Sequence, residues 1–225
     1  MQHGFSSFIV QGLQSVHDHE LCSQAIGLVE DLCLALGRHI RPYTDDIMKC
    51  LMELLASNAV DRSIKPKVVS VFTEIAVAIS NDFEVYFGVM DTLAEAAISC
   101  PFDFQNDDEE LTTLKLDLKS SILYAYNGIL LALVEKKDTL FQPHHIHNML
   151  ILVKEAGCPQ YETDLMGSEF QKNALALLKD LLYAYERKIQ PYLDQDFINL
   201  LTFASRDSDL KEEANKVMHM LRRVK

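Results

Sequence analysis

The amino-acid sequence predicts an all-α fold, a solenoid in which antiparallel helix pairs stack along one direction. The segment AIGLVEDLCLALGRHIRPYTDD, which begins at Ala25, matches the segment that begins at Ala174 at ten of its 22 positions without a gap. Its apolar positions recur at the spacing of a helix with one broad buried face, and no strand pattern competes with them. Self-similarity at a long fixed spacing is typical of proteins that stack one helical unit repeatedly.

The repeated helix occurs four times along the chain. Shifts of 43, 97 and 149 residues place the apolar pattern on segments that begin at Val68, Ile122 and Ala174. All four copies keep apolar or aromatic side chains at eight equivalent positions, which in the first copy are Ala25, Ile26, Leu28, Val29, Leu32, Cys33, Ala35 and Leu36. One position is alanine in every copy, and we expect neighbouring helices to approach closely there: Ala35, Ala78, Ala132 and Ala184.

Second helices are predicted between the copies, at 41–56, 82–99, 142–156 and 190–205. The first and the last of them carry a proline near the start, Pro42 and Pro191, where the missing N–H group costs nothing. The turns NAVDRS and SRDSD join the two helices of a pair. We expect Asp61 and Asp207 to stabilise these turns by pairing with the lysines four residues further on.

Polar insertions at 100–111 and 157–167 explain why the last two steps between copies are longer than the first. A period of roughly 40 to 47 residues with two helices per unit is typical of HEAT or armadillo repeats. The sequence therefore predicts a single right-handed HEAT-repeat α-solenoid over 1–225, of four to five antiparallel helix pairs, with approximate repeats at 1–38, 39–80, 81–136, 137–187 and 188–225.

The two ends of the chain differ in character. The C-terminal segment LKEEANKVMHMLRRVK is rich in charges, as a terminal capping helix should be. The N-terminal segment instead begins with an apolar helical face that has no preceding repeat to cover it, formed by Phe5, Phe8, Ile9 and Leu13. We therefore expect the chain to be a C-terminal fragment of a longer protein.

Charge and cysteine content limit the classes of partner and compartment. The chain has 33 Asp and Glu against 21 Lys and Arg, and its net charge of −12 favours basic partners over nucleic acid or anionic membranes. Its five cysteines lie mostly in apolar helical runs without a C-x-x-C pair, which indicates a reducing, intracellular compartment. The most apolar window, Ile122 to Val134, is too short to span a bilayer.

Catalytic and metal-binding motifs are missing from the sequence. It contains no Gly-rich phosphate loop, no G-x-S-x-G and no H-E-x-x-H motif, so we expect neither an enzyme nor a cofactor. His144, His145 and His147 lie close together, but His144 and His147 have no Cys or carboxylate partner at ligand spacing, so we expect no metal site.

Two long segments carry a family resemblance. The stretches CSQAIGLVEDLCLALGRHIRPYTDDIM and RSIKPKVVSVFTEIAVAISNDFEVYF, with an acidic segment before LYAYNGIL, resemble the C-terminal HEAT repeats of the importin-β family of nuclear transport receptors. The resemblance is dense from Cys22 to Leu133 and continues more loosely through ALALLKDLL. The chain departs from the family in having no tryptophan: Lys216 stands about where relatives often carry one in the last helix.

The resemblance implies a role in nuclear import, in the cytoplasm, the nucleus and the nuclear pore. Receptors of this family bind the basic importin-β-binding segment of the importin-α adaptor, or a basic cargo, on the inner surface of the superhelix. The full-length receptor is implied to bind Ran in its GTP form and the Phe-Gly repeats of nucleoporins, mostly outside this chain. The C-terminal repeats are implied to bind chiefly the adaptor.

The face of the repeated helix that is left over from the core is the candidate binding surface. In a stack, these narrow stripes line up into one groove whose carboxylates and tyrosines suit arginine and lysine side chains. The predicted partner-binding residues are Glu30, Asp31, Glu74, Tyr124, Asn127, Asp180 and Tyr183. An acidic loop offers a further contact or long-range attraction through Asp107, Asp108, Glu109 and Glu110.

Two alternatives remain open at the level of sequence. The carboxylates of the stripe also fit an ordinary solvated helix face, and Leu34, Val77 and Leu131 at its edge fit either partial packing or contact with a ligand. The chain would also suit a HEAT-repeat scaffold or adaptor subunit of a multiprotein complex that binds folded partners through its turns. The acidic inner stripe separates these functions, because an import receptor needs it and a general scaffold does not.

Overall fold

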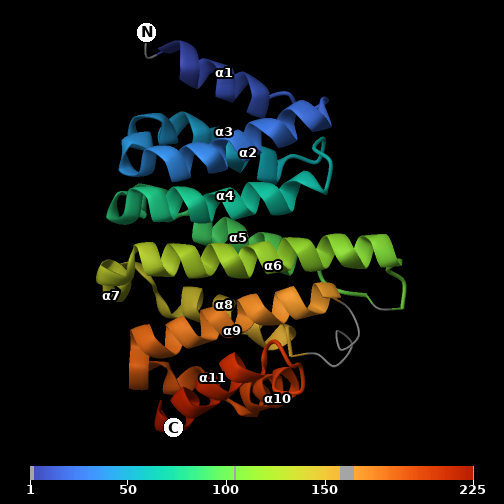
Figure 1. Cartoon of the computed structure of the whole chain (residues 1–225), viewed down its shortest axis with the longest axis vertical. Helices are drawn as coiled ribbons and strands as arrows, with labels where there is room; N and C mark the ends of the chain where they lie inside the picture. Colours follow the sequence, from blue (N-terminus) through green and yellow to red (C-terminus); the bar gives the residue numbers. More distant parts are fainter. Residues whose placement is uncertain (1–2, 104, 158–164, 225) are drawn as a thin grey trace.

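The computed structural model describes residues 3–103, 105–157 and 165–224. All regular secondary structure in these residues is helical, and the helices stack from the N-terminal to the C-terminal end along the long axis of the molecule (Figure 1). The predicted all-α solenoid is therefore confirmed.

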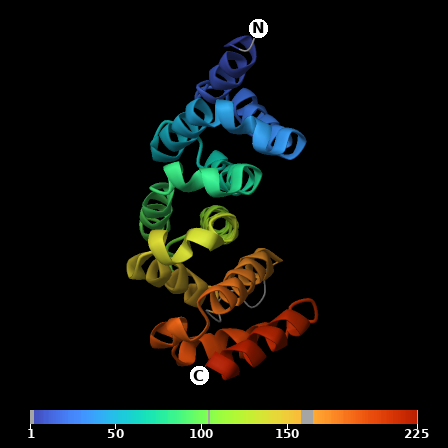
Figure 2. The same ribbon diagram turned by 90° about the vertical axis from the view of Figure 1, so that its left-hand side faces the viewer.

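The helices form two layers, which Figure 2 shows side by side. We call one layer the inner layer: α2 (His19–Leu36), α4 (Ile64–Ile79), α6 (Glu109–Ala132), α9 (Leu165–Tyr185) and α11 (Lys211–Val224). The outer layer contains α3 (Thr44–Ala56), α5 (Val89–Ile98), α8 (Pro143–Glu155) and α10 (Gln195–Ala204). Helix α1 (His3–Leu13) packs on α2 and α3, and α7 (Lys137–Leu140) is a single short turn. The four copies of the repeated segment are parts of α2, α4, α6 and α9.

Three outer helices begin later than the sequence suggested. Short 3-10 segments precede α3, α5 and α10, at Gly37–Tyr43, Ser80–Tyr86 and Glu186–Tyr192, and Pro42 and Pro191 lie inside them rather than in the first turn of the α-helix. The inner helices α2, α4 and α9 end at the same position of the repeat. The residues at this position, Gly37, Ser80 and Glu186, adopt φ angles of 51°, 51° and 46°. A positive φ breaks the α-helical path, so the chain turns there before the outer helix begins.

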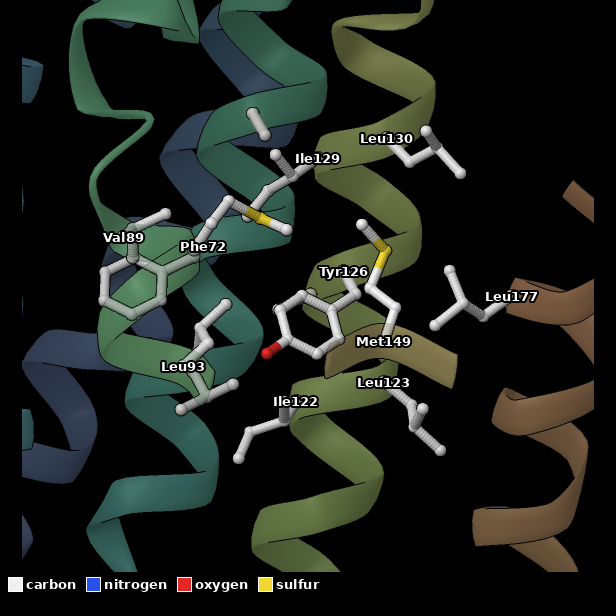
Figure 3. Packing of buried hydrophobic residues seen from close by; sticks show 14 of the residues in the cluster. Phe72, Val89, Leu93, Ile122, Leu123, Tyr126, Ile129, Leu130, Met149 and Leu177 are labelled. Carbon is white, nitrogen blue, oxygen red and sulfur yellow. The ribbon is translucent and has the colours of Figure 1, made fainter. Parts of the chain in front are cut away.

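The repeated apolar positions form a continuous core, as the pattern predicted. Figure 3 shows its centre, where Phe72 of α4, Leu93 of α5, Tyr126 of α6 and Met149 of α8 pack together. Neighbouring inner helices bury these side chains against one another, so each helix pair depends on the next for its core.

The expected role of the recurring alanine is wrong. Ala35 is exposed, and Ala78, Ala132 and Ala184 are only half-buried, because this position lies at the edge of the contact between helices. Two glycines do lie at close contacts between helices. A Cβ atom added to Gly12 would lie 2.7 Å from Cβ of Ala25, and one added to Gly128 would lie 2.4 Å from Cγ2 of Thr73.

The two aspartates of the turns act differently from the prediction. The carboxylate of Asp61 accepts hydrogen bonds from the backbone N–H group and the hydroxyl of Ser63, at 2.8 and 2.7 Å. Asp207 accepts from the backbone N–H group of Asp209 at 2.8 Å. The expected pairing with the lysines four residues on is wrong, because short aspartate side chains bond more readily to nearby backbone N–H groups.

Polar contacts keep neighbouring inner helices in register at both ends. Lys67 Nζ lies 2.7 Å from Ser23 Oγ near the N-terminal ends of α4 and α2, and Asn173 Nδ2 lies 2.9 Å from Ser120 Oγ near the middle of α9 and α6. Near the C-terminal ends, the pairs are Arg38–Asp82 at 3.6 Å and Asn81–Glu135 at 2.9 Å. Each contact joins the same or adjacent positions of the repeat, so equivalent residues lie side by side. Within the described residues, no helix is long and apolar enough to cross a membrane.

Candidate functional site

The inner layer brings three of the predicted stripe residues together. Tyr124 of α6 donates a hydrogen bond to Glu74 Oε1 of α4 at 3.0 Å, and Glu30 of α2 lies on the other side of Glu74. Burial raises the pKa of Glu30, and the charges of Glu74 and the exposed Asp31 raise it further. Burial and the bond to Glu74 raise the pKa of Tyr124 to about 12. The surface therefore concentrates negative charge that is poorly compensated.

A groove of about 540 Å³ adjoins this cluster, and its lining includes Glu30, Tyr124, Asp117 and Glu169. Burial raises the pKa of Asp117, so this carboxylate also gains from a cation nearby. Asp117 does not stand out in the repeat pattern because it precedes the repeated segment, in the N-terminal part of α6. Two lysines of the rim, Lys67 and Lys172, already bond to Ser23 and Glu169.

A second part of the stripe lies further along the stack. The side chain of Asn127 bonds to Asp180 of α9, and burial raises the pKa of Asp180. The adjacent Lys179 points toward α11, where its Nζ lies 2.8 Å from Glu213. Tyr183, one turn beyond Asp180, is exposed. The seven predicted residues thus lie along one face of the inner layer, in two polar groups, with Asp31 and Tyr183 exposed beside them.

Two of the four residues of the acidic loop, Asp107 and Asp108, stabilise the local structure. Lys115 Nζ lies 2.6 Å from Asp107, and this hydrogen bond lowers the pKa of Asp107. Asp108 caps α6 by accepting from the backbone N–H group of Leu111 at 2.8 Å. Glu109 and Glu110 are exposed in the first turn of α6, where negative charge favours the helix. Among the described residues, Asp107 and Asp108 thus have contacts that fix the loop and the cap, whereas Glu109 and Glu110 are exposed.

The charge at Lys216 in the last helix is balanced locally. Its Nζ lies 2.7 Å from Glu212 and 3.7 Å from Glu213, both on the same helix. The position at which the family resemblance implies a tryptophan therefore presents a paired lysine.

The structure places a carboxylate beside His144, which has no such partner at ligand spacing in the sequence, and beside His145. Asp91 Oδ1 of α5 lies 3.3 Å from Nε2 of His145 and 3.7 Å from Nε2 of His144. The ligand-type atoms of these residues lie within 4.8 Å of one another. However, Nδ1 of His145 accepts a hydrogen bond from the backbone N–H group of Gln142 at 3.0 Å, as part of the capping box of α8. Neutral His145 therefore carries its proton on Nε2, and a metal ion there would require the cap to break.

The same cap predicts a pH-dependent stability. Burial lowers the pKa of His145, His144 lowers it further, and Asp91 opposes both. The unfolded chain therefore binds the proton more readily than the folded chain, and the free energy of unfolding is expected to fall as the pH drops below about 6.5. His145→Gln keeps an acceptor for the cap but does not titrate, so urea unfolding between pH 7.5 and 5 should show a shallower decrease for this variant. The exposed His147 provides the control: His147→Gln should retain the wild-type profile, and equal slopes for wild type and His145→Gln would contradict the assignment.

Comparisons with known proteins identify the family of the chain. The family model described as "Importin subunit beta-1-like, TPR repeats" matches residues 1–206. The chain is 29% identical to importin subunit beta-1 of Arabidopsis thaliana over 98% of its length, and 32% identical to that of Schizosaccharomyces pombe over 88%. It spans about a quarter of these relatives, 25% and 22% of their respective lengths.

Solved structures show the same fold. A crystal structure of importin beta obtained in a polyethylene glycol condition superposes with a TM-score of 0.85, at 23% identity, over 99% of this chain and 27% of the other. A structure of Kap95p, whose binding induces the switch loops of RanGDP to adopt the GTP-bound conformation, gives 0.82 at 24% identity, over 99% of this chain and 26% of the other. A Kap95:Nup1 complex gives 0.80 with the same identity and coverage. The family model, the relatives and the stacked helix pairs agree: the chain belongs to the importin subunit beta-1-like family.

Proposed function

We propose that this chain is part of a nuclear import receptor and binds a basic protein segment on its inner layer. The observation that supports this most directly is the line of half-buried carboxylates Glu30, Glu74 and Asp180, among which burial raises the pKa of Glu30 and Asp180. Anionic groups that are partly removed from water and repel one another are stabilised when a cation arrives. A folded chain does not need such an arrangement for its own stability.

The chemistry of this surface suits arginine and lysine. A guanidinium group pairs with a carboxylate through two parallel hydrogen bonds and stacks on an aromatic ring. The inner layer offers both kinds of contact, since Tyr124 lies beside Glu74 and Tyr183 lies one turn beyond Asp180. The partner that we infer is the basic importin-β-binding segment of an importin-α adaptor, or a basic cargo that carries a similar segment.

The wider role follows from the relatives and belongs to the same proposal. Kap95p has been observed with RanGDP and with Nup1. We infer that the longer receptor of which this chain forms the C-terminal repeats also binds Ran and nucleoporins, and moves between cytoplasm and nucleus without any catalytic step of its own. The acidic face distinguishes this role from that of a general scaffold.

Titration with a labelled importin-β-binding peptide at low and high salt tests the proposal. The stripe variant carries Glu30→Gln, Asp31→Asn, Glu74→Gln and Asp180→Asn, and it is expected to bind at least about tenfold more weakly, equivalent to about 1.4 kcal/mol. Wild-type affinity should decrease with salt, and the decrease should be smaller in the variant.

A control variant changes net charge equally on exposed positions of the outer helices: Asp46→Asn, Glu53→Gln, Glu95→Gln and Asp196→Asn. It should retain the affinity within about twofold, because screening weakens distant charges. Equal losses in the two variants would show that net charge alone attracts the peptide, and absence of binding by the folded chain would contradict the proposal.

A further inference from the structure

A group of three metal-ligating side chains joins two neighbouring outer helices. Asp91 lies in the first turn of α5, and His144 and His145 lie in the first turn of α8, which packs on α5. Their ligand atoms lie within 4.8 Å of one another, a proximity that no other group of three such residues reaches in the part of the chain that the structure describes. The spacing of residues in the sequence does not reveal the group, because Asp91 stands 53 residues before His144.

The geometry of the group fits a zinc ion. Zinc takes four ligands in a tetrahedron at about 2.0–2.2 Å, which places neighbouring ligand atoms about 3.4 Å apart. Asp91 Oδ1 lies 3.3 Å from Nε2 of His145 and 3.7 Å from Nε2 of His144. Imidazole and carboxylate together suit zinc, whereas magnesium and calcium prefer oxygen ligands alone. The three side chains therefore offer zinc three of its four ligands, and water can supply the fourth.

The two imidazole rings are held beside Asp91 at the protein surface. The side chain of His145 is 7% exposed, and its ring packs edge-on against Phe87 with 5.1 Å between the ring centres. The ring of His144 lies next to that of His145, with 3.8 Å between their centres. The side chains of His144 and Asp91 are exposed, so an ion reaches the group directly from solvent.

The cap of α8 competes with a metal ion for the ring of His145. Nδ1 accepts a hydrogen bond from the backbone N–H group of Gln142 at 3.0 Å, so the proton of the neutral ring is on Nε2. An ion at Nε2 moves this proton to Nδ1, where it faces the N–H group of Gln142, and two donors form no hydrogen bond. A histidine that binds a metal ion usually donates its second N–H group to an acceptor, which is the opposite arrangement.

We propose that Asp91, His144 and His145 bind zinc, and that zinc and the N-terminal cap of α8 exclude each other. In the metal-free chain, the capping box stabilises the first turn of α8. With zinc bound, the ion takes the place of the proton between His145 and Asp91, and the N–H group of the exposed Gln142 turns to water. Zinc thus exchanges a cap within one helix for a firmer link between two helix pairs. The site lies on the outer layer and does not depend on the binding of a basic segment to the inner layer.

Competition with a chromophoric chelator for zinc at pH 7.5 tests the site. We expect the affinity for zinc to be at least about tenfold lower in each of the variants Asp91→Asn, His144→Gln and His145→Gln. His147→Gln changes an exposed histidine of the same helix and should alter the affinity less than about twofold. Absence of zinc binding by the wild-type chain, or losses in the three variants no larger than in this control, would overturn the inference.

Cobalt spectroscopy distinguishes the histidines from the cysteines of the chain. Two nitrogen ligands and one oxygen ligand should give visible bands of bound cobalt without a charge-transfer band from thiolate, and zinc should abolish these bands. A thiolate band that disappears on addition of zinc would show that cysteines hold the ion, and would overturn the inference.

The exclusion between ion and cap has a separate test at Gln142. Its φ of −72° and ψ of 161° suit proline, so Gln142→Pro removes the N–H group of the cap without forcing the backbone. This variant should bind zinc at least about threefold more tightly than Gln142→Ala, which keeps the N–H group. Nitrogen-15 shifts of the His145 ring should show the proton on Nε2 without zinc and on Nδ1 with zinc. Equal affinities of the two variants, or a proton that stays on Nε2, would overturn the exclusion.

Discussion

Glu155→Ala is expected to lower the free energy of unfolding by about 3–5 kcal/mol, because it leaves a buried lysine without its counter-charge. Lys119 of α6 has 3% of its side chain exposed, and its Nζ lies 2.6 Å from Glu155 Oε1 of α8. Nζ also lies 4.5 Å from the centre of the Phe102 ring. Glu155 is the only carboxylate that pairs with Lys119 among the described residues, so the loss should appear in urea unfolding followed by circular dichroism at pH 7.

Substitution of the other member of the pair, Lys119, should lower the free energy of unfolding much less. Glu155 keeps 30% of its side chain exposed, so Lys119→Met leaves a carboxylate that water can solvate while the methionine fills the apolar space. We expect a change within about 1.5 kcal/mol of wild type. Similar large losses in both variants would indicate that packing rather than the unpaired charge determines the effect.

Gly128→Ala is expected to destabilise the chain by about 2 kcal/mol, although alanine normally favours a helix over glycine. The added Cβ would lie 2.4 Å from Cγ2 of Thr73, where α4 and α6 meet. The control is Gly27→Ala in α2, where nothing lies within 4 Å of the added atom. This variant should gain about 0.5–1 kcal/mol, so the two changes should shift the urea midpoint in opposite directions.

The double variant Gly128→Ala/Thr73→Ala should recover most of the lost stability, since it removes the methyl group that clashes. It also removes the hydroxyl of Thr73, which is buried without a hydrogen-bond partner in the described residues. Losses that simply add in the double variant would show that the contact between these two helices is not the cause.

The inner helices could be predicted because their burial follows a local period. The eight apolar positions of each copy needed only the sequence, and most of them are buried. The prediction of a close helix contact at the recurring alanine was wrong, because the sequence does not distinguish a small side chain at the edge of a helix contact from one at its centre. The glycine that marks the real contact, Gly128, could be identified only once Thr73 was known to face it.

The 3-10 segments were not predictable in the same way. Ser80 and Glu186 adopt a positive φ that their residue types disfavour, so residue type alone does not reveal where the inner helix ends. Asp91 reaches His144 and His145 from 53 and 54 residues away, which no spacing rule detects. The repeat boundaries and the partner-binding residues stay predictions, since burial and charge locate a surface but do not identify what binds there.

The polar contacts between neighbouring inner helices are weak, which bears on how easily the stack can deform. Arg38–Asp82 and Lys188–Asp138 join successive repeats through exposed side chains, and such pairs contribute at most about 1 kcal/mol each. Apolar contacts have no preferred direction, so we expect the core to resist separation of the helices but to permit small sliding rotations between them. Such rotations would add up along the stack, so the pitch of the whole coil is expected to vary more than the geometry of any single repeat.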